Sequence, residues 1–151
     1  MKQYLKFSFK YCFKKTHDYP AILKINKLNK LHNYKIGKQN LKIESFPVQH
    51  GKIKSLLYKI NDKCAYVSDV SEIYKKDFDK LYNLNYLVID CLRYNFHPSH
   101  FNLGSAIEII KVLNPKKAIL TNLANDIDYK EIQKFLPNNV KPAYDGMNFL
   151  I

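Results

Sequence analysis

The sequence predicts an α/β domain built around a single mixed β-sheet. Three short apolar runs without a polar face, residues 64–67, 86–89 and 118–120, are typical of strands buried on both sides of a sheet. Between the last two, residues 101–113 carry apolar side chains at helical spacing, and an Asn-Pro pair then ends the helix. Buried strands that alternate with a helix indicate an α/β architecture.

Two antiparallel strands are predicted before these runs. Residues 41–46 alternate with period two, and Pro47 is expected to end this strand or to place it at a sheet edge. After a turn at residues 50–51, the chain continues as a strand over residues 55–60. It then turns at residues 61–63 into the first buried run.

The C-terminal third adds two short helices and a strand. Helices are expected over residues 77–82 and 128–135, and Asp128 is a plausible N-cap of the second because Glu131 follows it by three residues. A turn around Gly146 leads into a last short strand over residues 147–151.

Residues 1–40 give weaker patterns. Residues 6–13 alternate in part, like a strand, and residues 24–39 are rich in lysine and asparagine without an apolar stripe. We therefore expect residues 1–40 to be loosely ordered. No repeat or linker divides the chain, so residues 1–151 are expected to form one domain.

The composition is that of a globular protein. The chain has 151 residues, of which 46% are hydrophobic, enough to fill one core. No apolar run approaches the roughly 20 residues that span a membrane, and the lysine-containing start does not resemble a secretory signal. The cytoplasm is therefore the expected location. The three cysteines share no CxxC spacing, which predicts core thiols rather than disulfides or a zinc cage.

The net charge of +12 is concentrated at the start of the chain, where residues 1–46 contain eleven lysines against Asp18 and Glu44. Interleaved aromatic side chains there would suit phosphate neutralisation and base stacking. However, Arg93 is the only arginine, although arginine is the side chain that binds phosphate in a bidentate manner. Nucleic-acid binding is therefore the less favoured interpretation.

Polar residues cluster in sequence where the predicted strands end. Asp69 and Asp90 follow two of the buried runs, and His50 lies at the turn between the antiparallel strands. His97 and His100 follow Asp90 within ten residues. Imidazole and carboxylate groups at adjacent strand ends can bind a zinc-type ion, with a further histidine as general acid.

The same residues also fit a purely structural interpretation. His97 can begin a turn with Pro98, and Ser99 or Asn102 can cap the following helix. Asp69 can form a hydrogen bond with the backbone of a turn, and Asp90 can form an ion pair with the nearby Arg93. The spacing alone favours the structural interpretation, because clustered polar groups are often structural.

Five motifs in order resemble the metallo-β-lactamase superfamily, and in particular its phosphoribosyl cyclic phosphodiesterase-like branch. They are Phe46-Pro47-Val48-Gln49-His50-Gly51, Ala65-Tyr66-Val67-Ser68-Asp69, Leu87-Val88-Ile89-Asp90-Cys91-Leu92-Arg93 with His97-Pro98-Ser99-His100, Ala118-Ile119-Leu120-Thr121, and Pro142-Ala143-Tyr144-Asp145-Gly146. The resemblance extends from about Tyr11 to the end. It implies the C-terminal half of an αββα sandwich, with one mixed sheet and helices on one face.

The resemblance also implies roles for individual residues. His50 and Asp69 match metal ligands, the aspartate being the one that bridges two ions, and His100 matches the histidine that protonates the leaving group. Asp90 and His97 are expected to support these residues without binding the metal themselves. The implied cofactor is zinc or manganese, and the implied substrate is a small phosphodiester.

Two departures from the family pattern affect the expected chemistry. The principal ligand motif of the family, HxHxDH, does not occur in these residues, and Asn122 stands where the family has its last histidine ligand. Only two of the seven metal positions, His50 and Asp69, then remain. We therefore expect the isolated chain neither to hold stoichiometric zinc nor to hydrolyse a phosphodiester.

Three functional interpretations follow from this comparison. The chain is the C-terminal portion of a metal-dependent phosphodiester hydrolase that needs an N-terminal half, or a non-catalytic remnant of a split gene, or, least favoured, a basic nucleic-acid-binding module. An exposed apolar sheet face would associate with the complementary half or with a second copy.

Overall fold

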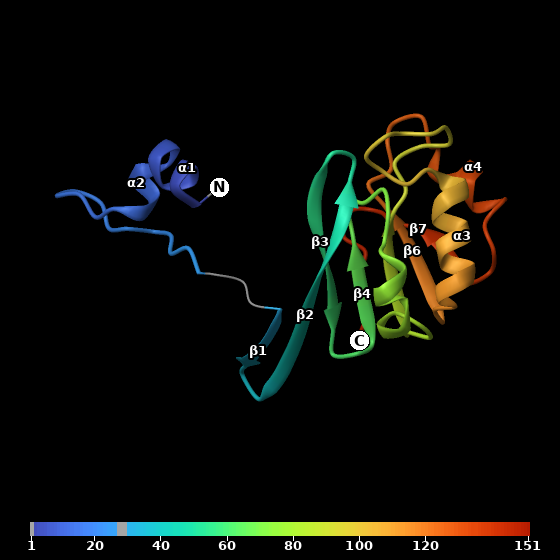
Figure 1. Cartoon of the computed structure of the whole chain (residues 1–151), viewed down its shortest axis with the longest axis horizontal. Helices are drawn as coiled ribbons and strands as arrows, with labels where there is room; N and C mark the ends of the chain where they lie inside the picture. The colour runs from blue at the N-terminus through green and yellow to red at the C-terminus, as the bar shows by residue number, and fades with distance from the viewer. Residues whose placement is uncertain (1, 27–29) are drawn as a thin grey trace.

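The computed structural model describes residues 2–26 and 30–151, and it contains one seven-stranded sheet (Figure 1). The strands are β1 (Leu31–Ile36), β2 (Gln39–His50), β3 (Ile53–Ile60), β4 (Cys64–Val67), β5 (Tyr86–Asp90), β6 (Lys117–Thr121) and β7 (Val140–Pro142). They lie in the sheet in sequence order. β1 to β4 pair antiparallel, and β4 to β7 pair parallel. The predicted α/β class with one mixed sheet is confirmed.

The helices of the described residues are short, apart from α3. They are α1 (Lys2–Ser8), α2 (Lys10–Phe13), the 3-10 helix η1 (Lys75–Lys80), α3 (Leu103–Leu113) and α4 (Tyr129–Gln133). In Figure 1, α3 and α4 lie beside the sheet, whereas α1 and α2 stand well away from it. None of the described helices is long and apolar enough to cross a membrane.

Alternation along the strands gives the sheet two different faces. One face carries Phe46, Leu57, Val67, Ile89 and Leu120, which are almost fully buried in a core with α3, α4 and the segment around η1. Since successive strand residues point to opposite sides, their neighbours form a second face. The helices that pack on the sheet therefore cover one face only, as the resemblance implied.

The second face is covered over β5 and β6 by the C-terminal segment. Met147 packs against the small cluster of Cys64, Val88 and Ile119, and the Phe149 ring stacks on Tyr86 with centroids 4.4 Å apart. The expected strand over residues 147–151 is therefore wrong. These residues form side-chain contacts across the face, and the seventh strand is β7, which precedes them.

The N-terminal predictions need correction. Residues 6–13 contribute to the helices α1 and α2 and do not form a strand, because their alternation was only partial. Part of the segment expected to be loose forms β1, which pairs with β2 from Leu31–Glu44 to Ile36–Gln39. The tight turn between these two strands contains Gly37 with a φ of +59°. Residues 27–29 lie outside the described part of the chain.

Pro47 does not end its strand. β2 continues to His50, and Pro47 pairs with Leu56 of β3. β1 stops at the Leu31–Glu44 pair, so Pro47 occupies a part of β2 that has no β1 residue beside it. This agrees with the edge position that was the alternative expectation.

The helix caps follow the sequence closely. The Asn102 side chain accepts a hydrogen bond from the Ser105 backbone N–H at the start of α3, and Asn114 ends α3 in the left-handed conformation. Asp128 caps α4 by accepting from the Lys130 and Glu131 backbone N–H groups. These contacts fix the loops that leave β5 and β6.

The turn between β3 and β4 is stabilised by a charge network. Lys59, although nearly buried, forms ion pairs of 2.7 Å with Glu44 and 2.8 Å with Asp62, and Lys42 forms another with Asp62 at 2.8 Å. Hydrogen bonds from Lys42 and Lys59 lower the pKa of Asp62 to about 2. The carboxylate therefore stays charged where an ordinary aspartate is protonated.

Replacing Asp62 by asparagine should make the protein less sensitive to acid. A lowered folded-state pKa contributes stability above the ordinary value of 3.8 that is lost as the pH falls towards 2. Because Asp62 is half exposed, the loss should be about 0.5–1 kcal/mol after screening. Urea titrations at pH 2.5 and 6 measure how much unfolding free energy each protein loses between the two pH values, and this loss should be smaller for Asp62→Asn. An equal loss in both proteins would contradict a lowered pKa of Asp62 in the folded state.

Candidate metal and phosphodiester site

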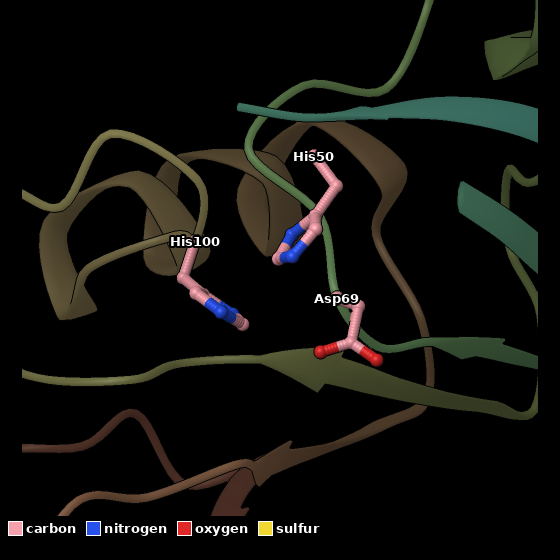
Figure 2. Close-up of side chains that lie close together, drawn as sticks. All are labelled: His50, Asp69 and His100. Atoms are coloured by element: carbon pink, nitrogen blue, oxygen red, sulfur yellow. The ribbon is translucent and has the colours of Figure 1, made fainter. Parts of the chain in front are cut away.

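Three side chains from separate segments point towards one another at the edge where β4 to β6 end. His50 is the last residue of β2, Asp69 follows β4, and His100 lies on the loop between β5 and α3 (Figure 2). One ligand atom from each lies within 4.8 Å of the others. The His50 and His100 rings meet edge to face, with centroids 4.6 Å apart. The structure thus brings together the three residues to which the family resemblance assigns direct roles.

His50 is oriented by a backbone carbonyl. Its Nδ1 lies 2.7 Å from the Ser99 carbonyl oxygen, which can only accept a hydrogen bond. Nδ1 therefore carries the proton, and in the neutral ring Nε2 keeps its lone pair free for a metal ion. Ligating histidines are commonly fixed in this way by the other ring nitrogen.

His100 is held by a buried carboxylate. Its Nδ1 lies 2.7 Å from Oδ2 of Asp90, whose side chain is 0% exposed. The same oxygen accepts a 3.0 Å hydrogen bond from the Val70 backbone N–H. Burial raises the pKa of the Asp90 carboxyl, and these two hydrogen bonds oppose part of that effect. Asp90 therefore pairs with His100, and the alternative pairing with Arg93 is wrong.

His97 lies beside this pair. Its ring centroid is 5.2 Å from that of His100, and its Nδ1 is 3.3 Å from the Ser99 backbone N–H, as expected for a turn residue. Desolvation lowers the pKa of His97, and the positive charge of Arg93 adds to this effect. The predicted support role of His97 and Asp90 stays a prediction, although both contact His100.

Asp69 has the most open position of the three. Its backbone adopts a left-handed φ of +53°, and its side chain is exposed. Among residues 2–26 and 30–151, no hydrogen bond to its carboxylate is found, so a turn-stabilising role is not supported. Positive φ at a residue with a Cβ is a costly conformation that is frequent at functional sites.

Asn122 occupies the neighbouring strand end. Its side-chain amide donates a 3.0 Å hydrogen bond to Ser68 Oγ, and its backbone is also left-handed at +61°. Ser68 precedes Asp69, so Asn122 lies at the rim of the site. An amide engaged with a hydroxyl therefore lies where the resemblance implies an imidazole in other members of the family.

Sequence reasoning missed the residues that hold the His50 turn. The Gln49 side-chain amide donates to the carbonyls of Gly51 and Ile53, at 2.7 and 3.1 Å, and Tyr74 donates its hydroxyl proton to Gln49 Oε1. Ser71 Oγ accepts from the Gly51 backbone N–H. Gln49 and Gly51 flank His50 within one of the quoted motifs, which was the available signal.

The model of the β-lactamase superfamily domain matches residues 1–121, about four fifths of the chain. The chain belongs to the metallo-β-lactamase superfamily. A crystal structure of a new diphosphatase from the PhnP family superposes with a TM-score of 0.81 at 26% identity, covering 97% of this chain and 53% of that one. This likeness places the chain on the PhnP-like branch.

Other members of the superfamily share the fold at lower identity. The metallo-β-lactamase fold protein YhfI from Bacillus subtilis matches with a TM-score of 0.69 at 18% identity, over 93% of this chain and 59% of that one. Zn²⁺-bound PqqB from Methylobacterium extorquens matches with a TM-score of 0.60 at 10% identity, over 74% of this chain and 50% of that one. No curated protein matches by sequence. The chain thus spans about half the length of these solved structures.

The donors of this superfamily member fit part of a divalent-ion site. Two nitrogens and a carboxylate oxygen are a usual set for zinc, and the contact of His50 Nδ1 with the Ser99 carbonyl leaves Nε2 as the nitrogen that could bind an ion. Two donors on one tetrahedral zinc ion stand about 3.4 Å apart, as bond lengths of about 2.0–2.1 Å require. The 4.8 Å spread is wider than that, and a closed site needs a fourth donor. The described residues therefore favour weak binding.

The turn that carries His50 depends on a glycine. Gly51 has a φ of +58°, and a Cβ built there would lie 2.8 Å from Ser99 Cβ. Gly51→Ala should destabilise the protein by about 2–4 kcal/mol, since a left-handed alanine costs about 1–2 kcal/mol and the clash adds to it. Chemical denaturation should show this loss.

Gly37→Ala is the matched control for this prediction. Gly37 has nearly the same φ of +59°, but nothing lies within 4 Å of the added Cβ. The difference between the two variants isolates the contact with Ser99. Equal destabilisation would mean that the close approach of the two loops does not constrain position 51.

The cysteines take no part in this site. Cys12, Cys64 and Cys91 are buried and unbridged, as predicted for core thiols. Burial raises the pKa of Cys64 to about 11 and that of Cys91 to about 12. Both thiols therefore stay protonated at neutral pH and are poor nucleophiles.

Proposed function

We propose that this chain forms part of the catalytic centre of a metal-dependent phosphodiester hydrolase. The pairing of His100 with the buried Asp90, directed at His50 and Asp69, carries the proposal. The likeness to a PhnP-family diphosphatase supports phosphorus-ester chemistry. The substrate would be a small phosphodiester.

The chain's own residues account for the proton transfer. Asp90 accepts from Nδ1 of His100 and stabilises the charged ring, because a fully buried carboxylate at 2.7 Å interacts strongly with an imidazolium. Nε2 of that ring can then donate a proton to the alcohol that leaves. Asp90 acts through His100, and it does not touch the substrate in this scheme.

His50 and Asp69 would hold the metal side of the centre. Divalent ions at such sites activate water and stabilise charge on the transferred group. Because two or three donors from this chain fall short of a closed site, we expect the isolated chain to bind zinc or manganese below stoichiometry and to show no turnover. A further set of ligands is needed for activity.

A non-catalytic remnant is the second candidate, and Asn122 is the observation that favours it. The amide at this strand end bonds Ser68, where a histidine would supply a stronger ligand. A protein under no demand for metal binding could lose that ligand without effect on its fold. The nucleic-acid interpretation gains no support from the site.

Elemental analysis and an assay with bis(p-nitrophenyl) phosphate test the proposal. NMR of the histidine side chains should show that millimolar zinc shifts His50 and His100, and that His50→Ala removes this response. Absence of any zinc effect on these rings would favour the remnant. Clear turnover by the isolated chain, abolished by Asp69→Ala, would refute the expected dependence on further ligands.

A further inference from the structure

A separate cavity lies at the end of the sheet opposite the candidate site. Its volume is about 360 Å³, which is within the range of small-molecule sites. Tyr86 and Lys117 line it, and they are the first residues of β5 and β6, whereas the candidate site lies where these strands end. Strands of five residues separate the two places by roughly 13 Å. The cavity is therefore distinct from the candidate site.

The register of the parallel strands brings the lining side chains to one face of the sheet. Tyr86 of β5 pairs with Lys117 of β6, and Ile119 of β6 pairs with Lys141 of β7. Residues two apart on a strand point to the same side, and so do paired residues on neighbouring strands. The two lysines therefore stand on the same face as Tyr86 and Ile119, with the cavity between them.

The C-terminal segment forms an apolar and aromatic wall of this cavity. The Phe149 ring stacks on Tyr86 at an interplanar angle of 22°, and Met147 packs against the cluster that contains Ile119. Phe149 is 36% exposed, so part of its ring remains uncovered. Aromatic rings and the methionine sulfur both make favourable contacts with a further planar ring. This wall therefore suits a ligand that has a flat aromatic part.

The other wall carries positive charge, and no carboxylate lines the cavity. Neither Lys117 nor Lys141 forms an ion pair with any of residues 2–26 and 30–151, and the Asn138 side chain, also in the lining, forms no hydrogen bond with them. Nζ of Lys117 lies 5.7 Å from the centre of the Tyr86 ring. Two unpaired ammonium groups and an amide supply hydrogen-bond donors, which favours an anionic ligand.

We propose that this cavity binds a small anion that carries a planar aromatic ring, either an aromatic carboxylate or an aryl phosphate. The anionic group lies between Lys117 and Lys141 and accepts a hydrogen bond from the Asn138 amide. The ring packs against Phe149 and Met147. This inference goes beyond the proposed function, and it needs neither a metal ion nor phosphodiester hydrolysis.

NMR titration of the full chain with benzoate, and separately with phenyl phosphate, tests the site. We expect millimolar or tighter binding that shifts the backbone signals of Lys117, Ile119 and Lys141. Binding of either probe at these residues supports the proposal, and the tighter of the two identifies the anionic group. Cyclohexanecarboxylate has the charge of benzoate without a flat ring, and it should bind about threefold more weakly.

Lys117→Gln combined with Lys141→Gln should weaken benzoate binding about tenfold, because both charges that face the anion are lost. Lys111→Gln combined with Lys130→Gln is the matched control. It removes the same charge from exposed lysines of α3 and α4, which pack on the other face of the sheet. The control should bind as the unchanged protein does. Equal weakening by both pairs would mean that benzoate responds only to the net charge, and it would overturn the proposal.

Phe149→Ala tests the packing of the ring and should weaken benzoate binding about fivefold. Phe135→Ala is its control, because Phe135 is 79% exposed and lies outside the cavity. Circular dichroism checks that each variant folds. Unchanged benzoate binding by folded Phe149→Ala would overturn the proposal. Probe shifts confined to His50 and His100 would place the anion in the candidate site and would overturn it as well.

Discussion

Asp90→Ala is expected to cost about 3 kcal/mol of folding stability. The carboxylate is 0% exposed, and one oxygen accepts from both the Val70 backbone N–H and His100 Nδ1. Alanine leaves both donors without a partner, and each unsatisfied group costs about 1–3 kcal/mol. Urea denaturation at pH 7 measures the loss, which should be accompanied by a mobile His100 ring.

Asp90→Asn is the matched control, because it preserves shape while removing the charge. Its amide oxygen, in the place of Oδ2, can still accept from both the Val70 backbone N–H and His100 Nδ1. Its amide nitrogen takes the place of Oδ1, which has no hydrogen-bond partner among the described residues. We expect stability within about 1 kcal/mol of the unchanged protein, and ¹⁵N shifts of His100 that keep the proton on Nδ1.

The pKa of Asp90 predicts in which direction folding stability changes with pH. A raised pKa means that the folded protein keeps this proton to a higher pH than the unfolded chain, whose ordinary value is 3.8. Stability of the unchanged protein should therefore fall, relative to Asp90→Asn, as the pH rises through the interval above 3.8. A constant difference from pH 4 to 8 would contradict a raised pKa at this position.

Local patterns were sufficient to predict the strands around the site. β5 is a short apolar run buried on both faces, and α3 has a single apolar stripe with an asparagine at each end. β4 was also predicted to be buried on both faces, but this is wrong at Tyr66, which is exposed. Each of these elements has only one arrangement that buries its apolar side chains. The positions of Asp69 and Asp90 after their strands follow directly from those boundaries.

The two chain ends could not be predicted in this way, because their structure depends on distant partners. Phe149 is held by stacking on Tyr86, more than sixty positions earlier, and no local period encodes that contact. β1 has mostly exposed side chains and becomes a strand through its pairing with β2. Pattern analysis detects burial, so an exposed strand gives little signal.

Within the site, the sequence indicated which side chains take part but not which hydrogen-bond partner each of them has. Asp90 could have paired with Arg93, only three positions away, yet the loop folds so that His100 reaches it. The carbonyl of Ser99 that orients His50 carries no side-chain signal at all. Backbone partners of this kind are visible only in three dimensions.

Asn122→His is expected to raise the zinc affinity of the isolated chain about 100-fold, or about 2.7 kcal/mol. Asn122 bonds Ser68, the residue before Asp69, so an imidazole at this strand end lies at the rim of the donor set. With His50 and Asp69 it would provide a third protein ligand, for a tetrahedral zinc site that takes four donors. Ser68 is half-buried and can exchange its lost partner for water. Isothermal titration with zinc measures the affinity.

Asn138→His controls for a histidine added elsewhere, because Asn138 is exposed and lies near the opposite ends of the parallel strands. It should leave the affinity unchanged. Asp69→Ala combined with Asn122→His should remove the gain, since both ligands must bind the same ion. If Asn122→His binds zinc no more tightly than Asn138→His, the strand end after β6 is too far from His50 and Asp69 to complete a site. The asparagine at that strand end would then not account for the weak zinc binding expected of this chain.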